Sequence, residues 1–527
     1  MLVIGLEPIR CCHRGILSPL RLPISPHQRT TYIIIPKSFL VKTNLIIIFC
    51  LHTKGLYAKI DYMEANIMDY KNNCGSNVII IGLTDSDEKV CAASGRISTQ
   101  PGSAMDIWAK SQDKEKNANL ISKVTRSGHN STVEHAYYNL AFENVSVMVE
   151  QFMIEFRLAS FTVKSRRYVD FSEVGYYSPD FGNEALNKEF NEHIEYLFAE
   201  YQNFVDAGIP KEDARFVLPY CFRSNFFCSL NARELLHVLH AMLHGRGSEY
   251  KEIYNLGKQL AEQVEKLTPG VMIDFESRKP ALSDKIDLSF IDKKTPDFKN
   301  VNTELLAYTP DAETVIAKNA LITETQLSAD EIDKLLNDED IKSKTIEAVV
   351  NSSRPRPLEA VSFTFRINNV SLATITHFAR HRIQSLSVPS LKYSNRENYI
   401  IPDTIKENAE LLEKYKLTFE KTAELYKKFV SSNISEEDAV YLLLAGNTLD
   451  LVLTMNAREL LLFFKLRTCT RAQWEIQIYA NEMLAKLREI SPQVFRHFGP
   501  SCYTTGKCPE GKLTCGRARE MQEKFRI

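Results

Sequence analysis

The sequence predicts an α+β protein that contains two copies of one domain, each a small sheet with long helices. Three observations predict this class: a length of 527 residues, an ordinary globular composition with 44% hydrophobic residues, and a repeat at a fixed offset of 225 residues.

The charge balance and the apolar runs bear on the possible partners. Lys+Arg 65 against Asp+Glu 66 leaves a net charge of -1, so no global basic field would collect nucleic acid. The longest apolar run, residues 45–51, is shorter than the roughly 18 residues that a membrane span needs. We therefore expect a soluble protein without a nucleic-acid or membrane partner.

The first residues, 1–72, are predicted to be an N-terminal extension. Between Met1 and Tyr62 this segment has only two acids, Glu7 and Asp61, and several prolines that would break a helix. Three interpretations remain open: a start codon assigned too early, a targeting segment, or a genuine tail. The eleven cysteines of the whole chain are too sparse for a disulfide scaffold, which favours a reducing, cytoplasmic location.

The repeat defines two domains, residues 73–298 and 299–527. The run Asn231–Leu236 (NARELL) returns as Asn456–Leu461, and many single residues recur at the same offset. Such pairs include Thr84 and Thr309, Glu134 and Glu359, Asn144 and Asn369, Arg157 and Arg382, and Ser165 and Ser390. Because one offset holds over the whole span, we infer duplication and fusion of a domain-sized unit.

Each repeat is expected to start with a strand, which the apolar run at residues 77–83 (NVIIIGL) predicts for the first copy. A helix-like stretch, a mixed segment, an amphipathic helix and a Ser-rich loop follow. Helical periodicity then predicts long helices over residues 186–207 and 408–430.

The segment at residues 371–394 (SLATITHFARHRIQSLSVPSLKYS) is the first candidate site. Apolar residues at helical spacing predict a helix that is capped by Ser371 and ends near Arg382. Cations at a helix end are favoured by the macrodipole alone. Hydroxyls and forked guanidinium groups also suit phosphate oxygens. The residues that would do so are Arg380, His381, Arg382, Ser390 and Lys392.

The segment at residues 456–476 (NARELLLFFKLRTCTRAQWEI) is the second candidate site. Asn456 and Glu459 have the spacing of a capping box, which predicts the start of a helix. Arg458 then lies in the first turn, where the helix dipole disfavours a cation, and such a local conflict indicates a functional residue. Arg467 lies nine residues further along and has Met242 as its counterpart in the first repeat.

Together these motifs resemble those of the flavin-dependent thymidylate synthases. Arg380-His381-Arg382, seven residues and Ser390 reproduce the RHR-x7-S signature, and residues 456–475 resemble the family's C-terminal helix. The resemblance implies two domains of this fold that make dTMP from dUMP, with methylenetetrahydrofolate as carbon donor and FAD and NADPH as reductants. It further implies that Arg380, His381, Arg382, Asn456 and Arg458 contact the flavin. Ser390 and Lys392 would hold the dUMP phosphate, and Arg467 would polarise the uracil ring as the catalytic residue.

The first repeat has complementary parts of the same pattern. Its flavin residues, by resemblance, are His129, Ser131, Glu134, Asn231, Arg233 and His237, and its dUMP residues are Ser165, Arg167 and Arg215. Val440 replaces Arg215 in the second repeat, and Glu155 replaces Arg380 in the first. The resemblance therefore implies composite sites, only some of them productive, and a homodimer of fused chains in place of the family tetramer.

The C-terminal tail has no counterpart in the first repeat. His497, Cys502, Cys508 and Cys515 could bind a structural zinc ion, but their spacing lacks a CxxC knuckle, and free thiols or a redox pair remain alternatives. Two alternatives to thymidylate synthesis also stay open. One is a flavin-dependent methyl or hydroxymethyl transferase that acts on another pyrimidine nucleotide, and the other is an inactive flavin- or nucleotide-binding paralogue.

Overall fold

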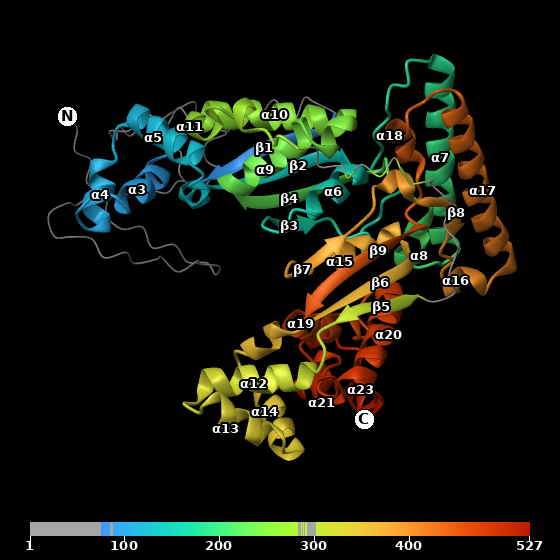
Figure 1. Cartoon of the computed structure of the whole chain (residues 1–527). Helices are drawn as coiled ribbons and strands as arrows, with labels where there is room; N and C mark the ends of the chain where they lie inside the picture. The colour runs from blue at the N-terminus through green and yellow to red at the C-terminus, as the bar shows by residue number, and fades with distance from the viewer. Residues whose placement is uncertain are drawn as a thin grey trace, which may run out of the picture. The chain divides into compact units, whose positions relative to one another are not determined.

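The computed structural model describes residues 75–84, 88–282, 286, 288, 290–291 and 302–526. The expected extension at residues 1–72 and the expected boundary at 298/299 lie outside these residues. Two antiparallel sheets and the helices around them form the described part (Figure 1). This confirms the predicted α+β class. None of the helices in these ranges combines the length and hydropathy that a membrane crossing requires.

The first sheet has the strand order β1-β2-β4-β3. Its strands are β1 (Asn77–Leu83), β2 (Tyr137–Ser146), β3 (Ser160–Val163) and β4 (Arg223–Asn231). The helices of the first half are α3 (Lys89–Ile97), α4 (Ala104–Lys110), α5 (Lys114–Arg126), α6 (Val147–Ile154), α7 (Glu184–Asp206), α8 (Lys211–Ala214), α9 (Ala232–Leu243), α10 (Lys251–Leu267) and α11 (Pro269–Met272). The strand expected at residues 77–83 is thus confirmed.

The second sheet has the order β5-β6-β9-β7, with β8 paired to β9. Its strands are β5 (Thr303–Tyr308), β6 (Ser362–Ser371), β7 (Gln384–Ser387), β8 (Asn395–Tyr399) and β9 (Asn447–Asn456). The helices of the second half are α12 (Ala312–Glu324), α13 (Ala329–Leu336), α14 (Glu339–Val350), α15 (Leu372–Ala379), α16 (Asp403–Lys406), α17 (Ala409–Ser431), α18 (Glu436–Ala439), α19 (Ala457–Arg467), α20 (Trp474–Ile490), α21 (Pro492–Phe495), α22 (Ser501–Thr504) and α23 (Ala518–Phe525).

The repeat seen in the sequence is also a repeat of detailed backbone geometry. Asn144 and Asn369 are 225 positions apart, and each has a positive φ, 54° and 55°, where β2 and β6 shift register against their partners. Asparagine tolerates the left-handed conformation that such a bulge needs. The two long helices α7 and α17 both have 23 residues and start after a capping asparagine, Asn183 or Asn408.

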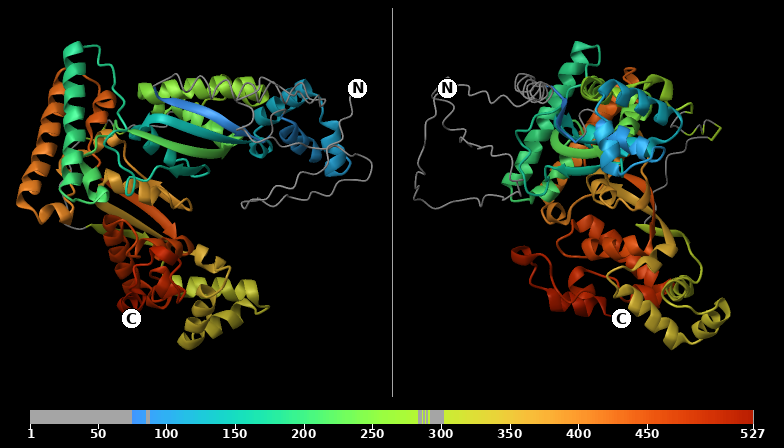
Figure 2. Two further views of the ribbon diagram at one scale, coloured as in Figure 1. Left: turned by 180° about the vertical axis from the view of Figure 1, so that it is seen from behind. Right: turned by 90° about the vertical axis from the view of Figure 1, so that its left-hand side faces the viewer.

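The two halves meet around an approximate twofold axis. Tyr220 N donates to Leu443 O at 2.7 Å, and Ala445 N donates to Leu218 O at 2.9 Å. The two bonds exchange under the 225 offset, which is the pattern of an isologous interface between equal partners. The helices α7 and α17 lie side by side (Figure 1 and the left view of Figure 2). Between them, Nε2 of His193 is 2.9 Å from Oγ1 of Thr422. Each half thus completes the core of the other.

Two local expectations need correction. The helix expected to reach Arg382 ends at Ala379, so the Arg-His-Arg segment lies in the turn that leads to β7. Ser371 does occupy the N-cap position, but its hydroxyl accepts no cap hydrogen bond; it donates to Glu475, a buried carboxylate on α20. The equivalent Ser146 does both, because its hydroxyl accepts from the Val149 N–H and donates to Glu252.

Candidate functional site

A cavity of about 350 Å³ lies where the two halves of the chain meet. The first half contributes the loop after β3 and Arg215, the second half contributes the ends of α15 and α19, and the tail from Pro500 to Met521 forms a further wall. The cationic side chains that line it are Lys164, Arg166, Arg167, Arg215, Arg380, Lys465, Arg467 and Arg471, against two carboxylates, Glu150 and Glu510. Such a lining favours a small, strongly anionic ligand.

On the first-half side, one arginine is neutralised by a partner of its own. Arg166 forms a buried ion pair with Glu150 of α6, and Ser224 Oγ donates to Glu150 Oε2 at 2.6 Å. Both charged side chains are almost fully buried, so each needs the other. The pair fixes the loop after β3 to α6.

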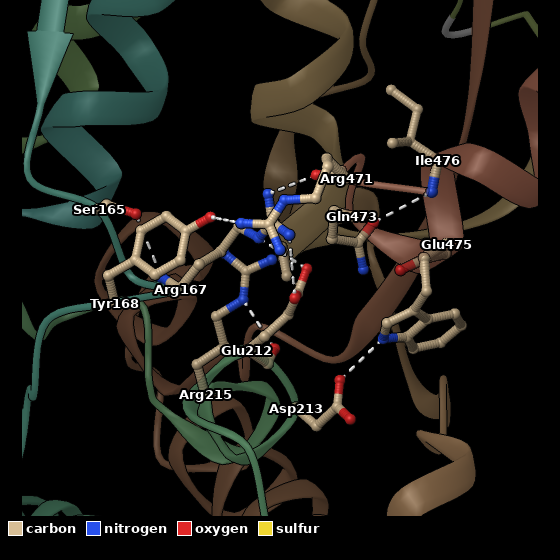
Figure 3. A network of polar contacts seen from close by, with 12 residues as sticks. Ser165, Arg167, Tyr168, Glu212, Asp213, Arg215, Arg471, Gln473, Glu475 and Ile476 are labelled. Carbon is tan, nitrogen blue, oxygen red and sulfur yellow. Dashed lines mark hydrogen bonds and ion pairs between the residues drawn. The ribbon is translucent and has the colours of Figure 1, made fainter. Parts of the chain in front are cut away.

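Arg167 and Arg215 are the neighbouring first-half cations, and Figure 3 shows both beside Glu212. Arg167 Nε lies 2.8 Å from Glu212 Oε1, and its Nη1 donates to the Arg471 carbonyl at 3.2 Å. Arg215 is 4% exposed; its Nε donates to the Glu212 carbonyl at 3.0 Å, but its Nη2 has no hydrogen-bond partner within the described ranges. Burial and the nearby Arg166 lower the pKa of Arg215 to about 10, so the guanidinium stays charged at neutral pH. A buried cation with an open donor fits an anion.

On the second-half side, Arg467 stands at the C-terminal end of α19 and is held from two directions. Its Nη2 donates to the His377 carbonyl at 3.1 Å, and its Nε donates to Nε2 of His381 at 3.0 Å. Since Nε2 accepts, Nδ1 of His381 carries the proton and donates to Glu459 Oε1 at 3.0 Å. Burial, then Arg380 and Arg167, lower the pKa of Arg467 to about 10, which leaves it cationic at neutral pH.

The predicted Arg-His-Arg segment therefore divides among three surroundings. Arg380 lines the central cavity, while His381 is 3% exposed and contacts Arg467 and Glu459. Arg382 donates to the Ala159 carbonyl at 3.0 Å and to Ser160 Oγ at 3.2 Å, across the boundary between the halves. Of the three side chains, only Arg380 and Arg382 present charge at a surface depression.

The predicted phosphate loop of the second half, Ser390 and Lys392, does not line the cavity with Arg380 and Arg467. Lys392 Nζ donates to Glu437 at 2.9 Å, and Ser390 Oγ is 3.5 Å from the Tyr250 hydroxyl. The first-half loop lies there instead, with Ser165 and Arg167 in the lining. The structure thus brings the loop after β3 of the first half together with Arg380 and Arg467 of the second half.

The place related to this cavity by the twofold axis lacks most of its charges. Ile375 and Leu391 replace Glu150 and Arg166, and Val440, fully buried, replaces Arg215. Glu155 replaces Arg380 and forms an ion pair with Arg246. The equivalent place therefore keeps no open cluster of arginines.

Which first-half residue corresponds to Arg467 depends on a two-residue insertion, which changes the offset between the repeats from 225 to 223. Ser146 and Ser371, 225 apart, donate to Glu252 and Glu475, which are 223 apart. The first half therefore has two more residues than the second between the start of α9 and the start of α10. The 225 offset pairs Arg467 with the buried Met242, and the 223 offset pairs it with His244, so neither offset supplies an arginine.

The predicted flavin residues occupy matched surface positions in the two halves. Arg233 Nη1 lies 2.6 Å from Glu134 Oε1, and Arg458 pairs with Glu359 in the same way. Asn231 and Asn456 cap α9 and α19, each accepting from the backbone N–H of the residue three positions on at 2.9 Å. His129 and Ser131 are exposed, and exposed His237 packs edge-to-face against Phe156. Glu359, Arg382 and Asn456 line a second, open depression of about 690 Å³.

The C-terminal cysteines lie at the central cavity, and His497 does not. Cys502, Cys508 and Cys515 line the cavity together with Cys469, which the sequence interpretation missed. His497 Nε2 instead accepts from Arg496 Nε at 3.1 Å. No three His, Cys, Asp or Glu side chains of the described residues are placed to hold a metal ion. The four thiols therefore form a wall of the cavity without the geometry of a zinc site.

Other residues of this site also escaped the sequence interpretation. They are Glu150, Arg166, His377 and Arg471. The sequence did mark the first three, because each is a polar or charged residue in one repeat and an apolar residue at the 225 offset in the other. The pairs are Glu150 and Ile375, Arg166 and Leu391, and His377 and Phe152.

Comparison with known proteins agrees with the repeat and with the motifs. Residues 80–270 and 304–493 each match the family described as "Thymidylate synthase complementing protein". A flavin-dependent thymidylate synthase of Clostridium tetani is 36% identical over 241 residues, 42% of this chain and 96% of that protein. One of Geobacter sulfurreducens is 36% identical over 226 residues, 42% of this chain and 97% of that protein.

Among solved structures, the UMP/dUMP methylase PolB from Streptomyces cacaoi, bound with 5-Br dUMP, is similar at a TM-score of 0.34 and 24% identity. The aligned region covers 39% of this chain and 97% of the PolB chain. The two thymidylate synthase relatives thus align over almost their whole length with less than half of this chain. The chain belongs to the thymidylate synthase complementing protein family, the family of the flavin-dependent thymidylate synthases, as a tandem duplication of its domain.

Proposed function

We propose that this protein is a flavin-dependent thymidylate synthase with one nucleotide site per chain, formed between its two halves. The observation that carries the proposal is the central cavity, where Ser165, Arg167 and Arg215 of the first half meet Arg380 and Arg467 of the second. The reaction would convert dUMP to dTMP, with methylenetetrahydrofolate as carbon donor and NADPH as source of electrons. The two enzyme domains would be residues 73–298 and 299–527.

The first-half cations fit the phosphate group of the nucleotide. Arg215 has an open Nη2, and Arg167 presents a guanidinium that Glu212 and the Arg471 carbonyl hold in place. The Ser165 hydroxyl accepts from the Arg167 N–H at 3.4 Å and lies at the same cavity. Planar guanidinium groups with fixed orientation bind phosphate oxygens with two parallel hydrogen bonds. Arg380 adds a further cation from the opposite wall.

Arg467 would face the pyrimidine ring as the catalytic cation. A fixed cation stabilises negative charge that develops on the ring carbonyls and on N3 as the ring is activated. The contacts from His381 and the His377 carbonyl fix the guanidinium before the substrate binds, so no reorganisation is required during the reaction. His381 and Glu459 are thus positioning residues for Arg467.

The chain's surface residues fit a flavin. The depression beside Arg382 and Asn456 is open and larger than the central cavity, and the pairs Glu134–Arg233 and Glu359–Arg458 offer charge at the corresponding positions of both halves. His129, Ser131, Asn231 and His237 would contact FAD from the first half. Bound FAD would supply the hydride that completes the methyl group. The family's multi-chain sites support a homodimer of fused chains as the active assembly.

The proposal is tested by turnover and stoichiometry on the full-length protein. Purified protein should be yellow and should release tritium from ring-tritiated dUMP in the presence of NADPH and methylenetetrahydrofolate. Calorimetry should then give one dUMP per chain. A yellow protein that binds dUMP but releases no tritium would indicate the inactive paralogue, and release only from another tritiated pyrimidine nucleotide would change the substrate. Two dUMP per chain would contradict the single composite site.

A further inference from the structure

His377 is a buried imidazole that lacks hydrogen-bond partners and faces the central cavity. It lies on α15, lines the cavity and is 6% exposed. Neither Nδ1 nor Nε2 has a hydrogen-bond partner within the residues that the structure describes. Buried polar groups in folded proteins are nearly always paired, so one that lines a cavity without a partner is a candidate contact for a ligand. Its counterpart in the first half is Phe152, so only the composite cavity has this imidazole.

The charges around His377 are almost all positive. Arg380 follows it on the same segment, Arg467 comes from α19, Arg215 from the short 3-10 helix at residues 215–217, and Arg167 from the loop after β3. The carboxylates on the packed helices are already engaged: Glu150 of α6 pairs with Arg166, and Glu475 of α20 accepts from Ser371 and Thr374. Burial and then these four arginines lower the pKa of His377 well below its usual value. Before a ligand binds, the ring is therefore neutral.

We propose that His377 takes up a proton when a nucleoside monophosphate enters the cavity, and then donates a hydrogen bond to it. A phosphate near neutral pH adds a charge of about −1.5 to −2. That charge offsets the field of the arginines, which adds to burial in disfavouring imidazolium in the cavity. A protonated ring donates from both nitrogens, so the unpaired atoms gain an acceptor on the ligand. The proton comes from solvent, and no bond to carbon or phosphorus changes. The inference rests on the proposed nucleotide site and adds a residue and a proton to it.

The test is calorimetric titration of the full-length protein with dUMP at pH 7, in two buffers that differ in ionisation enthalpy. The buffer dependence gives the number of protons taken up on binding. Because the nucleotide's own phosphate also changes protonation, the informative quantity is the difference between wild type and His377→Gln. We expect wild type to take up about half a proton or more beyond that variant, while His377→Gln still binds dUMP with weaker affinity.

The matched control is His193→Gln. His193 is a half-buried histidine whose pKa is lowered to about 4, mainly by desolvation, but it lies between α7 and α17, away from the cavity. This variant should retain the wild-type proton uptake. A second variant, His377→Phe, copies Phe152 of the first half and should lose the extra proton as His377→Gln does.

Each result decides the inference. Equal proton uptake by wild type and His377→Gln, with dUMP bound by both, would overturn the role of His377 and leave the nucleotide site standing. Failure of the folded wild-type protein to bind dUMP would overturn the proposed function as well. A role in packing alone would alter melting temperature or affinity without altering the proton count.

Discussion

The composite cavity and its twofold-related place form a natural comparison within one molecule. Apart from the C-terminal tail, which lines only the composite cavity, both are built from corresponding elements of the two halves. One has an open arginine cluster, and the other has Val440, Ile375 and an internal Glu155–Arg246 pair. The fold accommodates either a charged or an apolar lining at this place. Apolar residues replace the buried Glu150–Arg166 ion pair in the second half without a change of sheet topology. The difference shows that a few side chains determine the charge of such a place and that the scaffold does not require them.

Replacing Arg467 with alanine should have the largest effect on this comparison. Removal of a fixed cation that stabilises charge in the transition state should lower kcat about 10³-fold, about 4 kcal/mol. Steady-state dTMP formation measures this. The matched change in the related place, Arg246→Ala, should alter turnover less than about threefold. Full dUMP turnover by Arg467→Ala would make the catalytic assignment wrong.

The Glu150–Arg166 pair should give the next largest effect, on stability. Glu150→Ile alone leaves a buried unpaired guanidinium and should lower the free energy of unfolding by about 3 kcal/mol. The double variant Glu150→Ile with Arg166→Leu copies the second half and should recover most of that loss. Urea denaturation followed by circular dichroism measures both. A double variant no more stable than the single one would mean that the two places pack differently.

Arg167→Ala should weaken dUMP binding by about 2 kcal/mol, roughly 30-fold in Kd, because a charge-assisted contact with phosphate is lost. Its matched control is Lys392→Ala, at the equivalent position of the second half. Since Lys392 pairs with Glu437 away from the cavity, that variant should bind dUMP like wild type. Calorimetry with dUMP separates the two. Equal losses in both variants would indicate two working phosphate loops.

Glu459→Gln should have the smallest effect. Glutamine keeps an oxygen that can accept from His381 Nδ1 at the same place but removes the charge. The orientation of Arg467 should therefore persist, and kcat should fall about fivefold, about 1 kcal/mol, with KM nearly unchanged. Glu459→Ala, which removes the acceptor, should cost more. If Glu459→Ala left kcat unchanged, His381 would not need this carboxylate to hold Arg467.

Much of the fold followed from patterns within the sequence. The strand at residues 77–83 and the long helices were readable because local periodicity and the 225 offset both pointed to them. The end of α15 was misjudged, because the apolar spacing continues past Ala379 while the chain turns toward β7. The N-cap position of Ser371 was predicted correctly, but its bond to Glu475 was not, because that carboxylate lies 104 residues away in the chain.

The composition of the site was less accessible from sequence. The motif around Arg380 and Arg467 was visible, but which loop faces it depends on how two halves cross at the axis, a property that no local window carries. The same holds for the contact of His381 with Arg467, which joins residues 86 positions apart. Pairwise comparison of the repeats would have marked Glu150, Arg166 and His377 as places where the halves differ.

The reciprocal backbone bonds at Tyr220 and Ala445 have a consequence for how such a chain can change over generations. In a dimer of identical chains, any substitution appears on both sides of the axis, so a residue that suits one side and harms the other is eliminated. Fusion gives every position a single copy. Once Val440 and Glu155 are in place, neither half can pair with itself to rebuild the arginine cluster, since each lacks what the other supplies. Two separately produced halves should therefore recover function only when mixed. A return to a symmetric dimer of single domains would require several simultaneous substitutions.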